Sequence, residues 1–349
     1  MAYSTIPKGS LHMNPVLYTG NGSTQSITGV NFQPDWTWIK KRNGTTSHVL
    51  TDIVRGITKQ IYSNDTQAEN TNSDTITAIG SDGFTLGNRA DVNNNSDTYV
   101  AWNWKANGAG SANTDGYIAS TVSVNTTSGF SIVSYTGNGS ANTVGHGLGS
   151  APGLIIVKNL TTSGRQWQIL HHKNTAAPAT QQLEFGTDGT ATVTSQWNSV
   201  MPTASVFTIG TNDSTNKNGD SFIAYCFAEK QGYSKFGIYT GNANANGPFV
   251  YTGFKPSFVI IKRTNLANDW LTQDNKRYPI NETVAKTLKP NSALAEGDTG
   301  NLDILSNGFK LRSTGTNTNA SGGTYIYMAF AENPFVATSG TSAIPVTAR

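Results

Sequence analysis

One hexapeptide, YTGNGS, occurs at residues 18–23 and again at residues 135–140, and its first four letters return at residues 239–242. The tyrosines of these copies lie 117 and 104 residues apart, a spacing that fits whole small domains and is too long for the repeats of a solenoid. The chain of 349 residues is therefore expected to contain three related domains of about 100 residues each.

Three further landmarks follow each copy in the same order. A proline precedes an apolar run that ends in lysine, a short alternating run comes next, and an aromatic-rich run closes the copy. The apolar runs end at Lys40, Lys158 and Lys262, and the closing runs are residues 99–104, 222–227 and 325–330. Because four landmarks recur in one order, the sequence predicts an internal triplication.

The pattern within each copy is typical of β-structure. Short runs alternate between apolar and polar residues, and Gly- and Asn-rich turns separate them. Such runs indicate strands, and many short strands at close spacing indicate antiparallel sandwiches. We therefore predict an all-β protein of three tandem antiparallel β-sandwich repeats with jelly-roll or concanavalin-like topology.

The expected domain organisation follows from the landmarks and from the composition of the joints. It comprises an N-terminal arm at 1–15 that docks the protein, repeat one at 16–106, a Gly- and Asn-rich linker at 107–116, repeat two at 117–230, repeat three at 231–335 and a polar tail at 336–349. The joint between repeats two and three is very short, so these two repeats are expected to pack closely, whereas repeat one is expected to be hinged.

Composition excludes several partner classes. Charged residues make up 13% of the chain and its net charge is only +3, with no basic block, so no nucleic-acid partner is expected. No apolar run approaches the length of about 18 residues that a membrane span needs, so no membrane insertion is expected. The first 15 residues lack the apolar core of a secretory signal, which predicts synthesis in the cytoplasm.

The loop before the closing run of repeat one is the candidate metal site. Asp91, Asn93, Asn95 and Asp97 place oxygen ligands at every second position, as the first half of a calcium loop does. The bidentate glutamate of such a loop is missing, and repeat three has no acidic residue there. A polar hairpin loop is the favoured interpretation, with calcium binding as the alternative and no cofactor expected.

The remaining candidates favour structural roles. The histidines lack metal-ligand spacing, and the repeated lysines are interpreted as edge charges that discourage pairing between sheets. The tryptophans are interpreted as core residues, with stacking on sugar rings as the alternative. The histidines are His12, His48, His146, His171 and His172, and the tryptophans are Trp36, Trp38, Trp102, Trp104, Trp167, Trp197 and Trp270.

No catalytic arrangement is recognisable. The chain contains no phosphate loop, no nucleophile elbow, and no pair of carboxylates within a repeat of the kind that glycoside hydrolysis requires. No catalytic residues are therefore assigned, and the protein is not expected to be an enzyme.

Residues 17–30, 32–40 and 99–105, with residues 130–139, 146–152 and 155–158, resemble a repeat domain of virion proteins from marine tailed bacteriophages of the cyanophage and pelagiphage kind. Proteins with this repeat are structural or tail fibre proteins without catalytic residues. The resemblance covers repeats one and two, and repeat three departs from it. It implies a place on the virion, at the tail or on the head, and not a site.

Together these observations predict a non-catalytic structural protein of a tailed-phage virion. The first hypothesis is a tail-associated fibre or adhesin that attaches to a host surface glycan or protein, forms a homotrimer as fibres do, and turns its divergent third repeat outward. The alternative is a head decoration or knob protein bound to the capsid lattice. A carbohydrate-binding or carbohydrate-active sandwich protein is the less favoured third hypothesis.

Overall fold

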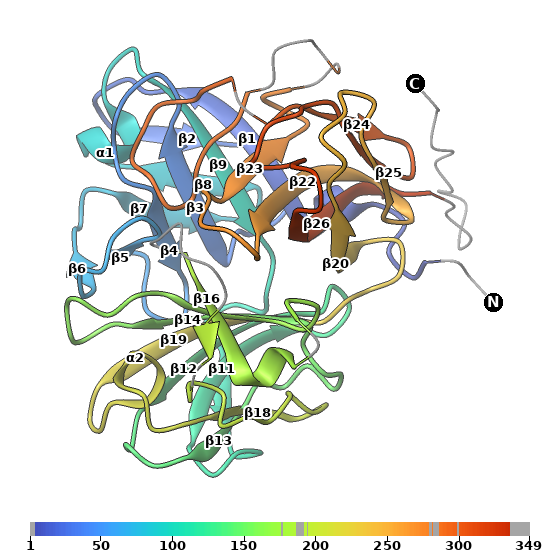
Figure 1. Ribbon diagram of the computed structural model, residues 1–349. Helices are drawn as coiled ribbons and strands as arrows, with labels where there is room; N and C mark the ends of the chain where they lie inside the picture. The colour runs from blue at the N-terminus through green and yellow to red at the C-terminus, as the bar shows by residue number, and fades with distance from the viewer. Residues whose placement is uncertain are drawn as a thin grey trace.

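A computed structural model describes residues 4–175, 177–185, 192–193, 195–278, 281, 286–298 and 300–335. The protein is all-β, as predicted, and each repeat combines a larger and a smaller antiparallel sheet (Figure 1). The finer jelly-roll or concanavalin-like assignment stays a prediction. The expected tail at 336–349 lies outside the described residues.

Repeat one combines a six-stranded sheet, ordered β1-β9-β3-β4-β5-β6, with a three-stranded sheet, ordered β2-β8-β7. Its strands are β1 (Met13–Thr19), β2 (Gln25–Ile27), β3 (Trp36–Lys41), β4 (Val49–Asp52), β5 (Lys59–Tyr62), β6 (Asn70–Thr71), β7 (Ile76–Gly80), β8 (Gly83–Leu86) and β9 (Thr98–Trp104). The 3₁₀ helix η1 (Gly9–Leu11) precedes β1, and the one-turn helix α1 (Ala90–Asn93) precedes β9.

Repeat two has an eight-stranded sheet, ordered β10-β11-β12-β19-β14-β15-β16-β17, and a two-stranded sheet of β13 and β18. Its elements are β10 (Ser111–Asn113), β11 (Ser120–Asn125), β12 (Phe130–Thr136), β13 (Asn142–Gly145), β14 (Leu154–Asn159), β15 (Gln168–His171), η2 (Pro178–Thr180), β16 (Gln181–Glu184), β17 (Thr192–Val193), β18 (Val206–Ile209), α2 (Asp213–Asn216) and β19 (Ser221–Phe227). The expected linker at 107–116 contains β10, so it is part of this sheet and not a free connection.

Repeat three combines a four-stranded sheet, ordered β20-β26-β22-β23, with a three-stranded sheet, ordered β21-β25-β24. Its strands are β20 (Ser234–Thr240), β21 (Phe249–Tyr251), β22 (Phe254–Arg263), β23 (Leu271–Asp274), β24 (Leu302–Leu305), β25 (Gly308–Leu311) and β26 (Thr324–Pro334). The first strands of the repeats, β1, β12 and β20, each pair with the last strand of the same repeat in the same register.

The middle strands of each large sheet are buried on both faces. In β3, Trp36 and Trp38 point toward the centre of the molecule, whereas Ile39 packs against the small sheet of its own repeat. In β9, Trp102 faces the centre and Tyr99 faces the small sheet. Two buried faces explain why these runs are nearly continuously apolar, as in other strands covered on both sides.

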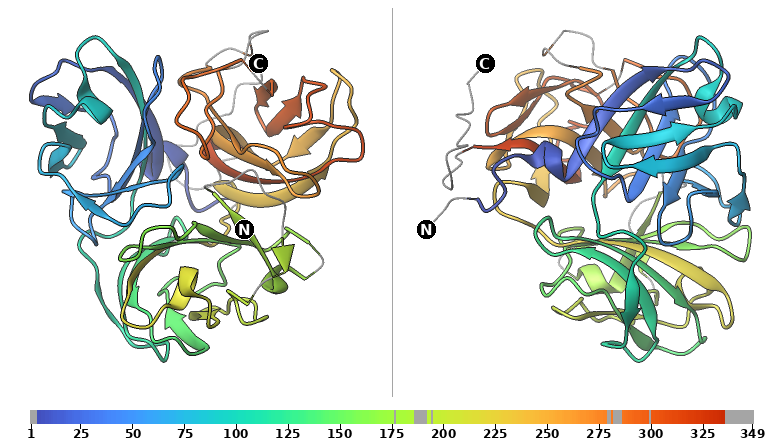
Figure 2. Two further views of the ribbon diagram at one scale, coloured as in Figure 1. Left: turned by 60° about the vertical axis from the view of Figure 1, so that its left-hand side comes forward. Right: turned by 180° about the vertical axis from the view of Figure 1, so that it is seen from behind.

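The three inner faces meet in one aromatic core. The ring centroids of Trp104 and Phe330 are 5.8 Å apart, those of Phe227 and Phe330 are 5.6 Å apart, and those of Trp36 and Tyr225 are 4.3 Å apart. These contacts join all three repeats, which form three lobes around a common centre (Figure 2). The expectation that repeat one is hinged is therefore wrong, because its tryptophans are buried against both other repeats.

Hydrogen bonds between neighbouring repeats follow the same threefold arrangement. The Tyr225 hydroxyl donates to Asp52 Oδ2 at 2.7 Å, and Trp102 Nε1 donates to Asp274 Oδ2 at 2.9 Å. At the third junction, His171 Nε2 lies 3.1 Å from the carbonyl oxygen of Tyr327. Asp52, His171 and Asp274 all end the equivalent strand of their repeats. A single chain thus forms the threefold arrangement that a trimer would form from three chains. The predicted homotrimer of complete chains stays a prediction.

The expected N-terminal arm belongs to the folded body. Ile6 and Met13 are buried in the central core, and a Cβ at Gly9 would collide with the backbone of Ala331 in β26. Strand β1 begins at Met13 and not at residue 16. Residues 4–15 are therefore not a free docking arm, because their apolar side chains complete the core between repeats one and three.

Candidate binding site

The predicted calcium loop has a structural role in this fold. Asn93 is fully buried, and its amide nitrogen donates to the carbonyl oxygens of Ser23 and Gly87 at 2.5 and 2.7 Å. Asp97 forms a 2.5 Å ion pair with Lys41. Over the described ranges, no group of three or more His, Cys, Asp or Glu residues could hold a metal ion. The polar-loop interpretation fits these contacts, because Asn93 and Asp97 have protein partners.

The same asparagine closes the hexapeptide turn in each repeat. Asn93, Asn216 and Asn319 each accept a hydrogen bond from the backbone N–H of the Asn in that turn, at 3.0, 2.9 and 2.8 Å. Each also donates to two or more backbone or side-chain oxygens. Sequence reasoning missed this role, although an asparagine at the same distance before all three closing strands was a visible signal.

The tyrosines of the repeated motif add further hydrogen bonds between the turn and the loop before the closing strand. The hydroxyl groups of Tyr18, Tyr135 and Tyr239 each donate to a backbone carbonyl in the loop before the closing strand, all at 2.7 Å. Each ring also stacks on the first aromatic residue of that strand, with centroids 5.0 to 5.1 Å apart. The repeated hexapeptide is therefore a structural signature of the repeat.

The interpretation of the three lysines as edge charges is wrong. Lys40, Lys158 and Lys262 are fully buried and lie on β3, β14 and β22, each of which has a neighbouring strand on both sides. Their ammonium groups donate to loop carbonyls, for example from Lys158 to Asn159 O at 2.8 Å and to Arg165 O at 3.1 Å. Burial lowers the pKa of Lys40 and of Lys158 to about 8.

The tryptophans are core residues, as favoured, since all seven are at most 4% exposed. The histidines bind the protein's own groups. His48 Nδ1 accepts from Trp38 Nε1 at 2.9 Å, and His146 Nδ1 accepts from the backbone N–H of Leu148 at 3.1 Å. Burial lowers the pKa of His171 to about 3, so this histidine is a neutral structural residue.

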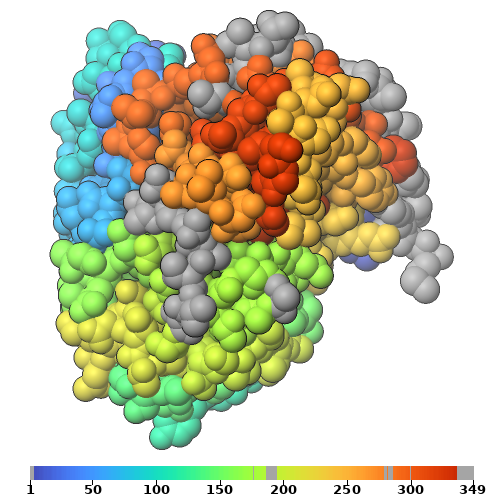
Figure 3. Space-filling model, in the orientation of Figure 1, coloured from blue at the N-terminus to red at the C-terminus, as the bar shows by residue number. Residues whose placement is uncertain are grey.

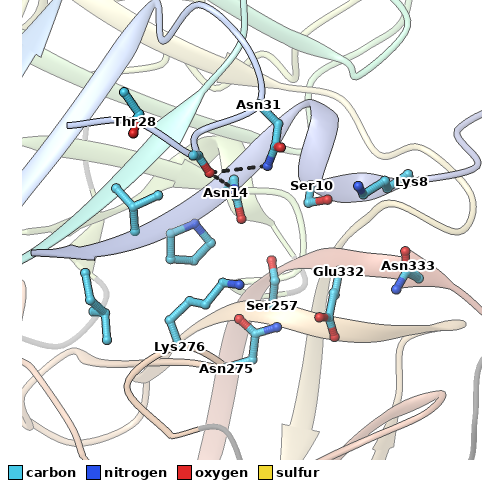
Figure 4. Close-up of a pocket in the computed structure, with 14 residues that line it drawn as sticks. Lys8, Ser10, Asn14, Thr28, Asn31, Ser257, Asn275, Lys276, Glu332 and Asn333 are labelled. Atoms are coloured by element: carbon cyan, nitrogen blue, oxygen red, sulfur yellow. Dashed lines mark hydrogen bonds between the residues drawn. The ribbon is translucent and has the colours of Figure 1, made fainter. Parts of the chain in front are cut away.

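Two open grooves lie at equivalent junctions between repeats. The first, the polar groove, has a volume of about 510 Å³ and lies between repeats one and three. Asn14 and Asn31 of repeat one line one wall, and Lys276 and Glu332 of repeat three line the other (Figure 4). Asn14 and Asn31 both donate to the carbonyl oxygen of Gly29, which holds this wall in place.

The second, the aromatic groove, has a volume of about 380 Å³ and lies between repeats three and two. Strands β20 and β21 form one wall, and Lys173 and Glu229 of repeat two form the other. Lys173 occupies the position of Lys276, two residues after β15 or β23, and Glu229 occupies the position of Glu332. The two grooves thus present the same pair of charged residues.

The third junction, between repeats one and two, is filled by the chain itself. Strand β11 pairs with β12 there, and Ser123 Oγ accepts a hydrogen bond from the N–H of Asn107 at 2.9 Å. Val54 and Ala106 stand at the positions of the Lys and the Glu. The charged pair is therefore kept at the two open junctions and absent from the one that the chain covers.

A larger share of the surface of the aromatic groove is apolar than in the polar groove. Ile238, Phe249 and Tyr251 are 46, 46 and 48% exposed, and Phe249 stands where repeats one and two have Ser26 and Thr143. An aromatic residue in a polar position was a signal that sequence reasoning missed. Figure 3 shows repeat three in contact with the other repeats, and residues of all three repeats share the central core.

The carboxylate and one ammonium group of the aromatic groove have different partners. Glu229 accepts from the N–H of Phe236 at 2.6 Å and lies 3.6 Å from His172 Nε2. Burial raises its pKa, but the interaction with His172 and the hydrogen bond from Phe236 together outweigh burial and lower the pKa overall. Lys235 Nζ donates to Tyr251 O at 3.1 Å and lies 5.5 Å from the Tyr251 ring centroid. The carboxylate is thus satisfied within the protein, and the ammonium borders the exposed ring.

Comparisons with known proteins place the chain in a family. The family model described as a domain of unknown function, DUF7483, matches residues 8–334, and the chain therefore belongs to that family. A search of curated proteins finds no match. In the part of the chain that the structure describes, no helix has the length and apolar character needed to cross a membrane.

Proposed function

We propose that this member of the DUF7483 family is a non-catalytic structural protein of a tailed-phage virion, namely a tail-associated adhesin that contacts the host surface. The resemblance of repeats one and two to phage virion repeats motivates the location. The aromatic groove of repeat three is the observation on which the contact role rests, because exposed aromatic side chains around a concave surface are typical of binding sites.

The shared core supports a preformed groove. The aromatic groove is formed by two repeats whose inner faces are buried in one core, so its walls keep their separation without a ligand. A site on a preformed scaffold loses little conformational entropy when it binds. The divergence of repeat three from the phage repeat pattern is consistent with a surface adapted to one host.

The threefold arrangement of the repeats favours one second candidate, a head decoration or knob protein. A body with three similar lobes matches a threefold position of a capsid lattice, since each lobe can meet an equivalent neighbour. In that case the outer surfaces of the lobes, and not the aromatic groove, make the principal contacts. In both candidates the partners are other virion proteins and copies of this chain.

Electron microscopy of labelled particles tests the location. Antibodies against repeat three and, in parallel, against repeat one are applied to intact virions. We expect both labels at the tail, and we expect only the antibody against repeat three to block adsorption to host cells. Label spread over the head would replace the adhesin by the decoration protein, and particles without label would contradict the virion proposal.

A further inference from the structure

We propose that the aromatic groove binds an anionic saccharide, a chain containing uronic acid residues. Phe249 and Tyr251 contact the sugar rings, and Lys173 and Lys235 pair with the carboxylates. This inference deepens the proposed contact role and takes its biological setting from it, but the binding chemistry follows from the groove alone. The repeat signature does not predict this site, because Phe249, Tyr251 and Lys235 stand where repeat one has Ser26, Thr28 and Asn14.

The apolar wall of the groove suits sugar rings. Phe249 and Tyr251 flank Val250 on β21, so their side chains share the outer face of the strand. About half of each side chain is exposed, whereas the large aromatic residues of the central core are almost fully buried. The C–H faces of a sugar ring pack against such rings, while its hydroxyl groups remain free to form hydrogen bonds.

The charge of the groove selects an anion. Lys173 and Lys235 contribute two positive charges, and the one carboxylate among the lining residues, that of Glu229, already accepts a hydrogen bond from the N–H of Phe236. Within the described chain no ion pair of Lys173 or Lys235 is found, and Lys173 is exposed. A uronate carboxylate can therefore pair with Lys173 and with a remaining N–H of Lys235, whose ammonium also donates to Tyr251 O.

The edge of β20 disfavours a polypeptide in this groove. The N–H of Phe236 donates to Glu229, and its carbonyl oxygen is 2.7 Å from His172 Nε2. A peptide strand that adds to a sheet edge needs a series of free backbone N–H and C=O groups, as β12 presents along the whole of β11. Beyond Phe236, only Ile238 and Thr240 point their backbone groups to the open side. That edge is too short for a stable strand, but it can bond to sugar hydroxyl groups.

The polar groove provides an internal comparison. It has the equivalent lysine, Lys276, but the structurally equivalent wall carries Ser26 and Thr28 in place of Phe249 and Tyr251. A ligand held by charge alone would occupy both grooves. A ligand that needs rings as well as charge would occupy only the aromatic groove.

The test titrates the full-length protein with tetragalacturonate, with its fully methyl-esterified form, and with neutral maltotetraose. Calorimetry and backbone amide NMR are the two readouts. We expect saturable binding of tetragalacturonate alone, with shifts at the amides of Ile238 and Thr240, and weaker binding at high salt. Equal binding of the esterified form, or no binding of any of the three, would overturn the proposal.

Variants separate the groove from general attraction of anions. We expect Tyr251→Ala to weaken tetragalacturonate binding about tenfold, which corresponds to about 1.4 kcal/mol for the lost contact with an exposed ring. We expect Lys173→Ala combined with Lys235→Ala to abolish binding. Tyr117→Ala removes a 79% exposed tyrosine outside the groove, and Lys276→Ala removes the equivalent lysine; both should leave binding unchanged. If these controls weaken binding as much, the site is wrong.

The outcomes also separate this inference from the proposed function. Label at the tail combined with no uronate binding would leave the adhesin in place and refute the ligand class. Uronate binding combined with label on the head would keep the site and refute the adhesin. Concentration-dependent dimerisation that Tyr251→Ala removes, without saccharide binding, would show that a second copy occupies the groove instead.

Discussion

Buried polar side chains hold the loops of every repeat, and they explain why the same few residues recur. An asparagine, a tyrosine and a lysine from each repeat donate to backbone carbonyls that would otherwise be buried without partners. A buried carbonyl or amide without a partner costs about 1–3 kcal/mol. Recurrence of the three side chains therefore reflects hydrogen bonding of the backbone and not a repeated binding site.

Asn216 offers a direct test at this scale. Its side chain accepts from Asn138 N–H and donates to Ser140 O and Gly210 O. We expect Asn216→Ala to lower the free energy of unfolding by about 2–4 kcal/mol, because it leaves several buried groups unpaired. The control Asn218→Ala, at an exposed position in the same loop, should stay within about 0.5 kcal/mol. Equal urea denaturation curves for the two variants would contradict the role of Asn216 in holding the turn.

Lys158 gives the protein a predictable pH dependence. Its pKa of about 8 in the folded state lies below the ordinary lysine value of 10.5, so between these two pH values the unfolded chain binds more protons than the folded one. Stability should therefore rise as the pH rises from about 8 toward 10. Urea denaturation at pH 7.5 and 9.5 measures this rise.

The variant Lys158→Met separates this lysine from the other titrating groups. It should lower stability at pH 7.5, because three loop carbonyls lose their donor, and it should reduce the rise in stability toward pH 9.5. Lys173→Met, at an exposed position, is the matched control. A pH dependence in Lys158→Met identical to that of the wild type would show that this ammonium does not contribute.

At the scale of elements, strand β11 decides which junctions stay open. It continues the sheet of repeat two beyond β12, and its apolar residue Val122 packs into the core of that repeat. Among the described residues, no such strand neighbours β1 or β20, the first strands of repeats one and three. Pro15 in β1 lacks an N–H, and Glu229 binds the N–H of Phe236 in β20, so both edges are protected against further pairing.

A pair of substitutions on β11 tests this covering role. Val122 is 4% exposed, whereas Thr121 on the opposite face is exposed. We expect Val122→Asp to destabilise the protein by several kcal/mol, since it buries an unpaired charge, and Thr121→Asp to have little effect. Hydrogen exchange at the amides of β12 should accelerate in Val122→Asp alone; equal exchange in both variants would contradict the assignment.

At the scale of the whole molecule, the three repeats should unfold as one unit. Trp36 contacts Trp104 within repeat one and Tyr225 and Phe227 of repeat two. We expect a single calorimetric transition, and we expect Trp36→Ala to lower the free energy of unfolding by about 3–5 kcal/mol. Hydrogen exchange should then increase in all three repeats. Separate transitions, or exchange confined to repeat one, would show that the core does not couple the repeats.

The sequence by itself determined the triplication, the all-β class and the order of the landmarks, because strand alternation and turn residues act over a few neighbouring positions. It also favoured core packing for the tryptophans over stacking on sugar rings, and the structure buries all seven. Alternation along β3 puts Lys40 on the same face as Trp36 and Trp38, but the sequence did not predict its burial, because a charged residue is rarely buried.

Only the tertiary structure decided how the repeats meet. Contacts between residues more than 100 positions apart in the chain, such as Trp102 with Asp274 and Tyr225 with Asp52, decide three features of the fold. They decide which face of each large sheet is covered, whether residues 4–15 are free, and which junction β11 fills. Periodicity identifies an apolar face but not its partner. The aromatic groove also depends on how the repeats meet, because residues of two different repeats form its two walls.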